Sequence, residues 1–150
     1  MRVVRLVIAA VVLAVIGSGC GVFGDDGESS GSGALDGLWV AVEIDGQPIV
    51  IDDNTEQVPS IEVTGGELAG SFGCGDGDAS FTIGEVSLTV ETVGVPDDGC
   101  ESVAVSFAEN AVLDVLAAEE VGYTIDDGRM VWVAAGRQIV FESASEPPTS

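Results

Sequence analysis

Three cysteines are the most reactive side chains of this 150-residue chain. Cys20 stands alone near the N-terminus, whereas Cys74 and Cys100 lie in the middle of the chain. A disulfide between these two would close a loop of about 26 residues, for which chain entropy predicts roughly 3.5 kcal/mol of stabilisation. The alternative is a pair of buried free thiols. We expect the disulfide, because the N-terminal segment described below predicts export to an oxidising compartment.

The composition excludes several kinds of chemistry. The chain has 26 acidic residues, four arginines, no lysine and no histidine, and its formal net charge is −22. Without histidine there is no Ser-His or Cys-His nucleophile and no His-ligated zinc. Such a negative chain repels phosphates, so we expect no nucleic-acid partner. Carboxylates remain for acid–base work, but they fall mostly in predicted turns and on solvent-facing strand positions. We therefore predict that the protein is not an enzyme.

Two acidic clusters are candidate calcium sites. One consists of Asp76 and Asp78, and the other of Asp52, Asp53 and Glu56. Carboxylates on a loop are suitable calcium ligands, but neither cluster has the repeated alternate acids and closing glutamate of a calcium loop. Chance clusters are common in so acidic a chain. We predict no metal site and no cofactor.

Residues 1–19 have the pattern of an export signal. Arg2 and Arg5 precede an apolar run at 6–16, which is too short to span a bilayer. Small residues then lead directly into Cys20, which resembles the lipobox of bacterial lipoproteins, although Gly17 stands where leucine is usual. The alternative is an ordinary secretory signal with a chance cysteine. We predict palmitate-type lipidation of Cys20, and hence a domain anchored on the extracytoplasmic side of a bacterial cell membrane.

The rest of the chain divides into a tether, one domain and a tail. Residues 20–34 are rich in Gly, Ser and Asp and are typical of a flexible linker. The folded domain is expected at 35–142, followed by a disordered tail at 143–150. Alternating apolar residues and Gly-containing turns predict strands through most of the domain, and helical spacing predicts one helix over 103–118. The expected strands lie near 38–44, 61–63, 68–72, 81–83, 86–90, 123–125, 130–133 and 139–141.

Four short motifs in order resemble the META domain family, which includes the heat-shock lipoprotein HslJ. They are a Leu-x-Gly-x-Trp start, a Gly-x-x-Gly-Cys turn, a helix pattern that begins with Glu, and an Asp-Gly hairpin before the last strand. The matching motif residues are Leu35, Gly37, Trp39, Gly70, Gly73, Cys74 and Glu109. Gly75 replaces the family's asparagine after the first cysteine, and the approach to Cys100 is looser than the family pattern.

The resemblance implies a mainly β (α+β) fold, a small antiparallel barrel-like sheet with one packed helix. It implies no enzymatic activity and an association with the cell envelope and stress. We expect an exported, membrane-anchored lipoprotein that supports the envelope or binds an envelope protein. The alternative is a carrier of a small apolar ligand inside the barrel. A filled barrel with an exposed apolar patch favours the first, and an internal cavity favours the second.

Overall fold

The computed structural model describes residues 32–50, 58–97 and 102–145. The two helices of these parts are α1 (Ser32–Leu35) and α2 (Val103–Leu116). The strands are β1 (Gly37–Ile44), β2 (Gln47–Pro48), β3 (Ser60–Thr64), β4 (Glu67–Ser71), β5 (Asp76–Ile83), β6 (Ser87–Gly94), β7 (Glu120–Asp126), β8 (Arg129–Ala134) and β9 (Arg137–Ala144).

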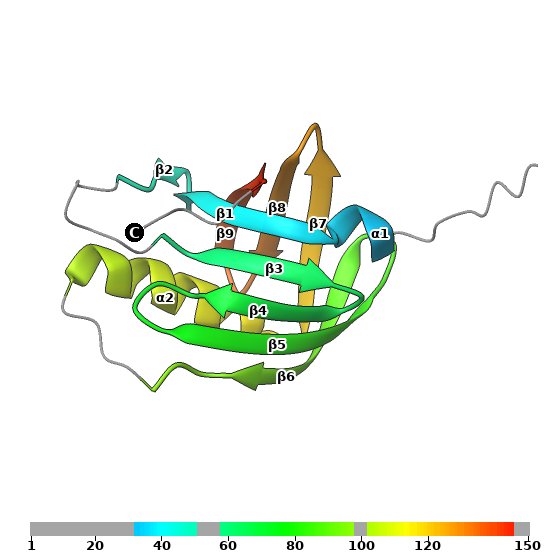
Figure 1. The fold of residues 1–150 in the computed structure, drawn as a ribbon, viewed down its shortest axis with the longest axis horizontal. Helices are drawn as coiled ribbons and strands as arrows, with labels where there is room; N and C mark the ends of the chain where they lie inside the picture. Colours follow the sequence, from blue (N-terminus) through cyan, green and yellow to red (C-terminus); the bar gives the residue numbers. More distant parts are fainter. Residues whose placement is uncertain (1–31, 51–57, 98–101, 146–150) are drawn as a thin grey trace, which may run out of the picture.

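Eight of these strands form a closed antiparallel barrel. From β3 to β9 each strand pairs with the next, β1 pairs with β3, and β9 returns to pair with β1. The two-residue β2 pairs with the end of β1, beside the β1–β3 pairing. Figure 1 shows β3, β4 and β5 in front, with β7 and β8 crossing behind them. The predicted barrel-like antiparallel sheet with a packed helix is therefore confirmed.

Two-residue turns connect four of the strand pairs. In each turn both residues have positive φ, which is the type I′ geometry that matches the twist of a hairpin. Three of these turns were expected from Asp-Gly and Gly-Gly dipeptides, which adopt this geometry readily. The fourth places an alanine at φ 52°. The four turns are Asp45-Gly46, Gly65-Gly66, Asp127-Gly128 and Ala135-Gly136.

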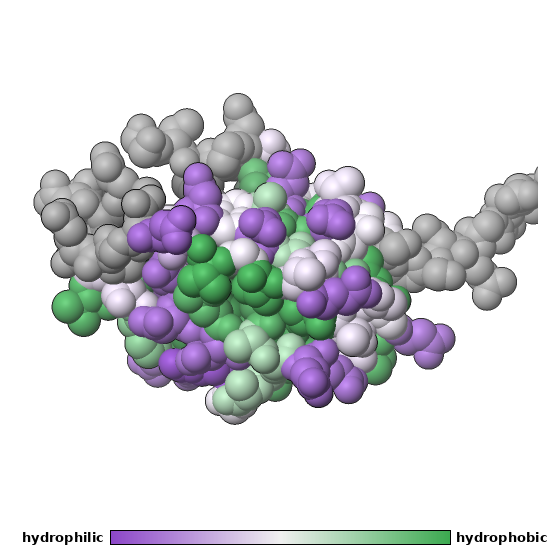
Figure 2. All heavy atoms as spheres, turned by 90° about the horizontal axis from the view of Figure 1, so that it is seen from below, coloured by the Kyte–Doolittle hydropathy of each residue, from purple (hydrophilic) through white to green (hydrophobic). Residues whose placement is uncertain are grey.

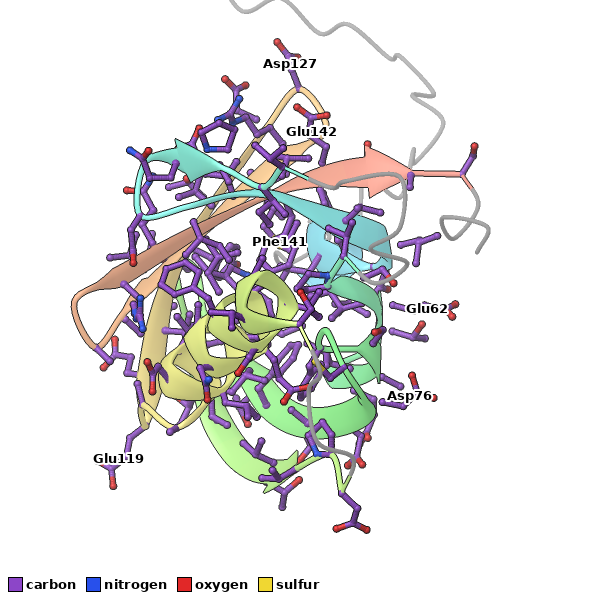
Figure 3. The ribbon with its side chains drawn as sticks, turned by 90° about the vertical axis from the view of Figure 1, so that its left-hand side faces the viewer. Glu62, Asp76, Glu119, Asp127, Phe141 and Glu142 are labelled. Carbon is purple, nitrogen blue, oxygen red and sulfur yellow. The ribbon has the colours of Figure 1, made fainter. Side chains whose placement is uncertain are left out.

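Helix α2 crosses the mouth of the barrel, as Figure 3 shows from that end. The sequence predicted a helix over 103–118, and the observed helix ends two residues earlier, at Leu116. The amide of Ala117 donates to the Leu113 carbonyl and closes the last turn. One face of the helix is buried: Val105, Ala108, Ala111, Val112, Val115 and Leu116.

The helix occupies a place where two neighbouring strands separate. β6 pairs with β7 only through Ser87–Thr89, and the amide of Val90 makes one further bond to the Glu119 carbonyl. Beyond this point Val93 of β6 and Leu113 of α2 are half-buried against the core. Figure 2, which looks from below onto β6 and α2, shows apolar side chains gathered in the middle of this face. Part of the apolar surface on this side is therefore accessible to solvent.

The barrel interior is filled with large side chains. Trp132 packs edge-on against Phe141, with 5.0 Å between ring centroids. Trp39 and Trp132 are both buried, as expected for aromatic residues that form a core. The largest fully buried side chains are Trp132, Phe72, Phe141, Leu35, Ile44, Ile61, Leu68, Leu88, Leu116, Met130, Ile139 and Val63.

The described fold extends slightly past the predicted domain. Helix α1 begins at Ser32, within the predicted tether, and β9 ends at Ala144, two residues beyond 142. The predicted signal segment, Cys20 and most of the tether and tail lie outside the described residues. Within the described ranges, no helix is long and apolar enough to cross a membrane.

Candidate functional site

The first family motif holds the start of the barrel together. Leu35 ends α1 and is fully buried, and its carbonyl accepts a 2.8 Å hydrogen bond from the Trp39 indole Nε1. Gly37 lies between them at φ +143°, a conformation that side chains rarely adopt. The motif therefore lets α1 fold back onto β1. Its role is structural.

The second motif lets backbone segments approach closely at the β4–β5 connection. A Cβ on Gly70 would clash with the Ser60 carbonyl oxygen of β3. A Cβ on Gly73 would lie 3.0 Å from the Glu109 Cβ and 3.1 Å from the Val105 carbonyl oxygen of α2. Both glycines also have positive φ. The spacing of the motif thus follows from contact with β3 on one side and with α2 on the other.

Glu109 joins the helix to this connection. Its Oε2 accepts hydrogen bonds from the amides of Cys74 at 3.0 Å and Gly75 at 3.2 Å. A carboxylate that accepts from two backbone amides forms stronger bonds than a neutral acceptor does. The matching residues Gly73, Cys74 and Glu109, far apart in sequence, therefore meet at one junction that fixes α2 on the barrel.

The structure describes one of the three cysteines. Cys74 is disulfide-bonded. The other two cysteines, Cys20 and Cys100, both lie outside the described residues, so the structure does not identify the partner. The Cys74–Cys100 pairing and the lipidation of Cys20 therefore stay predictions.

A second junction, centred on Arg137, was not expected from the sequence. The Arg137 guanidinium donates to Asp45 of the β1–β2 turn at 2.8 Å and to Asp114 of α2 at 3.0 Å. It also lies 5.3 Å from the centre of the Phe107 ring, in cation–π contact. The junction ties β9, a turn and the helix together across the mouth of the barrel. Arg137 stands apart from the other arginines in the sequence, and no local motif predicts this junction.

The charges of this junction stabilise one another. The pKa of Asp45 is lowered, first by the hydrogen bond from the Gln138 amide and then by the one from Arg137. The pKa of Arg137 is raised by its bonds to Asp45 and then to Asp114. The site resembles a structural ion-pair network, because all three charged side chains are partly exposed and already paired.

The acidic cluster of Asp76 and Asp78 is not placed with a third ligand to hold a metal among the described residues. Asp76 and Asp78 lie at the start of β5, rather than in a loop, and both are exposed. In the part of the chain that the structure describes, no other group of three or more His, Cys, Asp or Glu residues is placed to hold a metal either. Asp52, Asp53 and Glu56 lie outside the described residues.

An apolar patch lies on the outer surface of the barrel. A shallow depression of about 280 Å³ is lined by residues of β7, β8 and the end of the β5–β6 connection. Val86 is 72% exposed and Val133 is 51% exposed. We call this surface the outer valine patch; its lining residues are Val86, Gly122, Tyr123, Thr124, Val131 and Val133.

The sequence carried a signal for this patch that was missed. β8 reads Met130-Val131-Trp132-Val133-Ala134, which is apolar on both alternating faces. Met130 and Trp132 point into the core, so Val131 and Val133 must face outward. Val131 and Val133 follow the outward-facing Arg129, and two successive apolar residues at outward positions of a barrel strand indicate a surface that binds something else.

The comparisons with known proteins agree with this architecture. The META domain family model matches residues 33–146. No curated protein matches the chain.

Two NMR structures share the fold. One is 15% identical and covers 73% of this chain and 90% of its own, with a TM-score of 0.60. The other, from Burkholderia xenovorans, is 19% identical and covers 77% of this chain and 87% of its own, with a TM-score of 0.61. The family match covers the whole barrel and all seven motif residues. This chain therefore belongs to the META domain family.

Proposed function

We propose that the protein is an exported lipoprotein, anchored at Cys20, whose META domain acts in the cell envelope by binding another protein. The main support for a binding role is that apolar side chains are found on both sides of the barrel wall. Large side chains fill the inside, while Val86 and Val133 are exposed outside. Exposed apolar surface of this kind marks interaction sites in soluble domains.

The motif residues support a binding role over a catalytic one. They form two structural junctions, one at Trp39 and one at Glu109, that hold a rigid barrel. The charged side chains at the Arg137 junction are paired with one another. A rigid scaffold that presents an apolar outer face is suited to recognition by shape and charge.

The alternative role, a carrier for a small apolar ligand, has one observation in its favour. The Nε1 of Trp132 is buried and has no hydrogen-bond acceptor within the described structure. A bound molecule could supply the acceptor, but so could a single buried water, which is common in globular proteins. Native mass spectrometry of the purified protein separates the two roles. An interaction module is expected at the mass of its covalently lipidated chain, whereas a carrier retains in addition a stoichiometric ligand that organic extraction removes.

Anchoring is tested by replacing the cysteine at the proposed cleavage site. Cys20→Ala should abolish the lipid-dependent mass increase and move the protein out of the membrane fraction. Cys20→Ser is the matched control for side-chain size and polarity and should behave in the same way. A Cys20→Ala protein that stays fully membrane-bound would show that the apolar segment itself is the anchor.

A further inference from the structure

The outer valine patch is bounded by carboxylates at both ends. On the outward face of β7, Gly122 and Thr124 lie in the patch, and Glu120 and Asp126 lie two residues beyond them on either side. Both carboxylates are exposed. Figure 3 shows the neighbouring Glu119 at one end of the molecule and Asp127 and Glu142 at the other. An apolar stripe is thus framed by negative charge.

Among the described residues, Arg129 is the arginine beside the patch, and it is already paired. Arg129 lies opposite Glu142 in the β8–β9 ladder and forms an ion pair with Glu43 of β1 at 3.6 Å. Glu43 in turn lies opposite Val140, so this pair crosses the outer side of β9. Three carboxylates lie near this one guanidinium: Asp126, Asp127 and Glu142. The end of the patch near the β7–β8 turn is therefore negative overall.

The geometry limits the form of an occupant. β8 is paired along its length with β7 on one side and β9 on the other, so its backbone offers no free edge for an added strand. The occupant must lie on the side chains. Glu120 and Asp126 are six residues apart, which corresponds to about 20 Å along a strand. An α-helix of about 13 residues spans the same length.

The charge of the chain argues against two other occupants. A second copy would carry the same net charge of −22 and would bring carboxylates against carboxylates at the ends of the patch. An anionic lipid surface would be repelled in the same way. Positive charge at both ends of an apolar face complements the patch instead.

From these features we infer that the outer valine patch binds a cationic amphipathic helix of a partner protein. Apolar side chains at i, i+3 or i+4 and i+7 of that helix lie on Val131 and Val133, and its Lys or Arg residues lie near Glu120 and Asp126. This inference rests on the proposed binding function and adds the chemistry of the partner.

The test uses a synthetic probe and the full-length chain in nanodiscs of zwitterionic lipid. The probe is a fluorescent peptide of about 14 residues with a leucine stripe and lysines at both ends. A scrambled peptide of the same composition lacks the stripe, and a second control has glutamate in place of lysine. Fluorescence anisotropy, with empty nanodiscs as blank, should show binding of the striped cationic peptide alone and weaker binding as salt rises.

Two matched pairs of variants localise the binding. Val131→Ser with Val133→Ser should raise the Kd about tenfold, whereas Val50→Ser with Val103→Ser, at exposed valines elsewhere, should not change it. Glu120→Gln with Asp126→Asn should raise the Kd about fivefold at low salt and flatten the salt dependence. Glu62→Gln with Asp76→Asn removes two charges on the strands β3 and β5 and should have little effect. Circular dichroism confirms that each variant is folded.

The outcomes that overturn the inference are distinct. Equal binding of the scrambled peptide would show a non-specific charge effect, and indifference to the β8 variants would show that the helix binds elsewhere. Patch-dependent self-association in sedimentation would assign the patch to a second copy. Failure of the probe, together with a patch-dependent protein cross-link in intact envelopes, would refute the cationic helix but not the proposed binding function.

Discussion

The Glu109 side chain connects helix α2 with the Gly-x-x-Gly-Cys motif. Its carboxylate accepts from the Cys74 and Gly75 amides, which lie some 35 positions away in sequence. Replacing Glu109 with alanine leaves two partly buried amides without this acceptor, and we expect a loss of about 2 kcal/mol in the free energy of unfolding. Glu109→Gln keeps an acceptor but no charge and should cost about 1 kcal/mol. Urea denaturation measures both.

The matched control for Glu109 is Glu62, an exposed glutamate of β3. Glu62→Gln should leave the free energy of unfolding unchanged within about 0.5 kcal/mol. Equal effects at the two positions would mean that the hydrogen bonds to the β4–β5 connection contribute nothing specific.

Some of these residue roles were visible in the sequence, and others were not. The Gly-x-x-Gly-Cys pattern pointed to a constrained turn, because glycine tolerates close backbone approach and positive φ. The sequence did not show that Glu109 accepts hydrogen bonds from this turn, because that contact depends on where α2 lies. The Arg137 junction could not be predicted from the sequence, because Asp45, Asp114 and Arg137 come together only when the barrel closes.

At the scale of elements, the Arg137 junction should make stability depend on acid. The lowered pKa of Asp45 means that its carboxylate stabilises the folded state at neutral pH. This contribution is present above the usual aspartate pKa and is lost as pH falls through the lowered pKa of the folded state. The melting temperatures of wild type and Asp45→Asn should therefore differ at neutral pH and converge towards pH 3.

Asparagine suits this test because Asp45 has φ 50°, which asparagine also tolerates. The comparison between the two proteins removes the general effect of titrating the other acids. Glu62→Gln serves again as the control and should show no convergence of its own. A difference between wild type and Asp45→Asn that stays constant down to pH 3 would contradict the ionic role of Asp45.

Cys74, in the β4–β5 connection, is disulfide-bonded, and the sequence offers Cys20 and Cys100 as partners. A Cys74–Cys100 bond would enclose β5 and β6, and replacing both cysteines with serine should cost roughly 3 kcal/mol in the free energy of unfolding. Non-reducing peptide mapping of the exported protein should find the linked pair. A Cys20–Cys74 linkage, or two alkylatable thiols, would contradict both the bridge and the free Cys20 needed for lipidation.

The order of strands and helix was largely predictable from the chain. Alternation identified most strands, and Asp-Gly and Gly-Gly dipeptides marked three of the four type I′ turns. The fourth turn was only marked by Gly136, because alanine at positive φ is unusual. The closure of β9 onto β1 came with the family resemblance, since local periodicity carries no information about which distant strands pair.

Considered as a whole, the molecule is a barrel with a filled inside and an apolar patch on the outer side of β7 and β8. The Glu109 junction attaches α2 to the β4–β5 connection, and the Arg137 junction attaches it to β9 and the β1–β2 turn. These bonds hold the helix on the barrel before any partner arrives. Preorganisation of this kind lowers the entropy cost of binding. The strong net charge keeps copies of the chain apart and favours positively charged partners.

The proposal that the outer valine patch binds a protein of the cell envelope can be tested in intact envelopes. The chain has no lysine, so amine-reactive reagents would report poorly on its surface. A genetically encoded photo-cross-linking residue at Thr124, which lines the patch and is exposed, avoids this problem. The same residue at Glu62 of β3 is the matched control.

Irradiation of intact envelopes should give a discrete protein adduct from Thr124 and none from Glu62. The adduct from Thr124 should weaken when Val131 and Val133 are both replaced by serine, because the helix or other partner would lose its apolar contact. Adducts of equal yield from the two positions, or an adduct at Thr124 that the two serine replacements leave unchanged, would contradict the account.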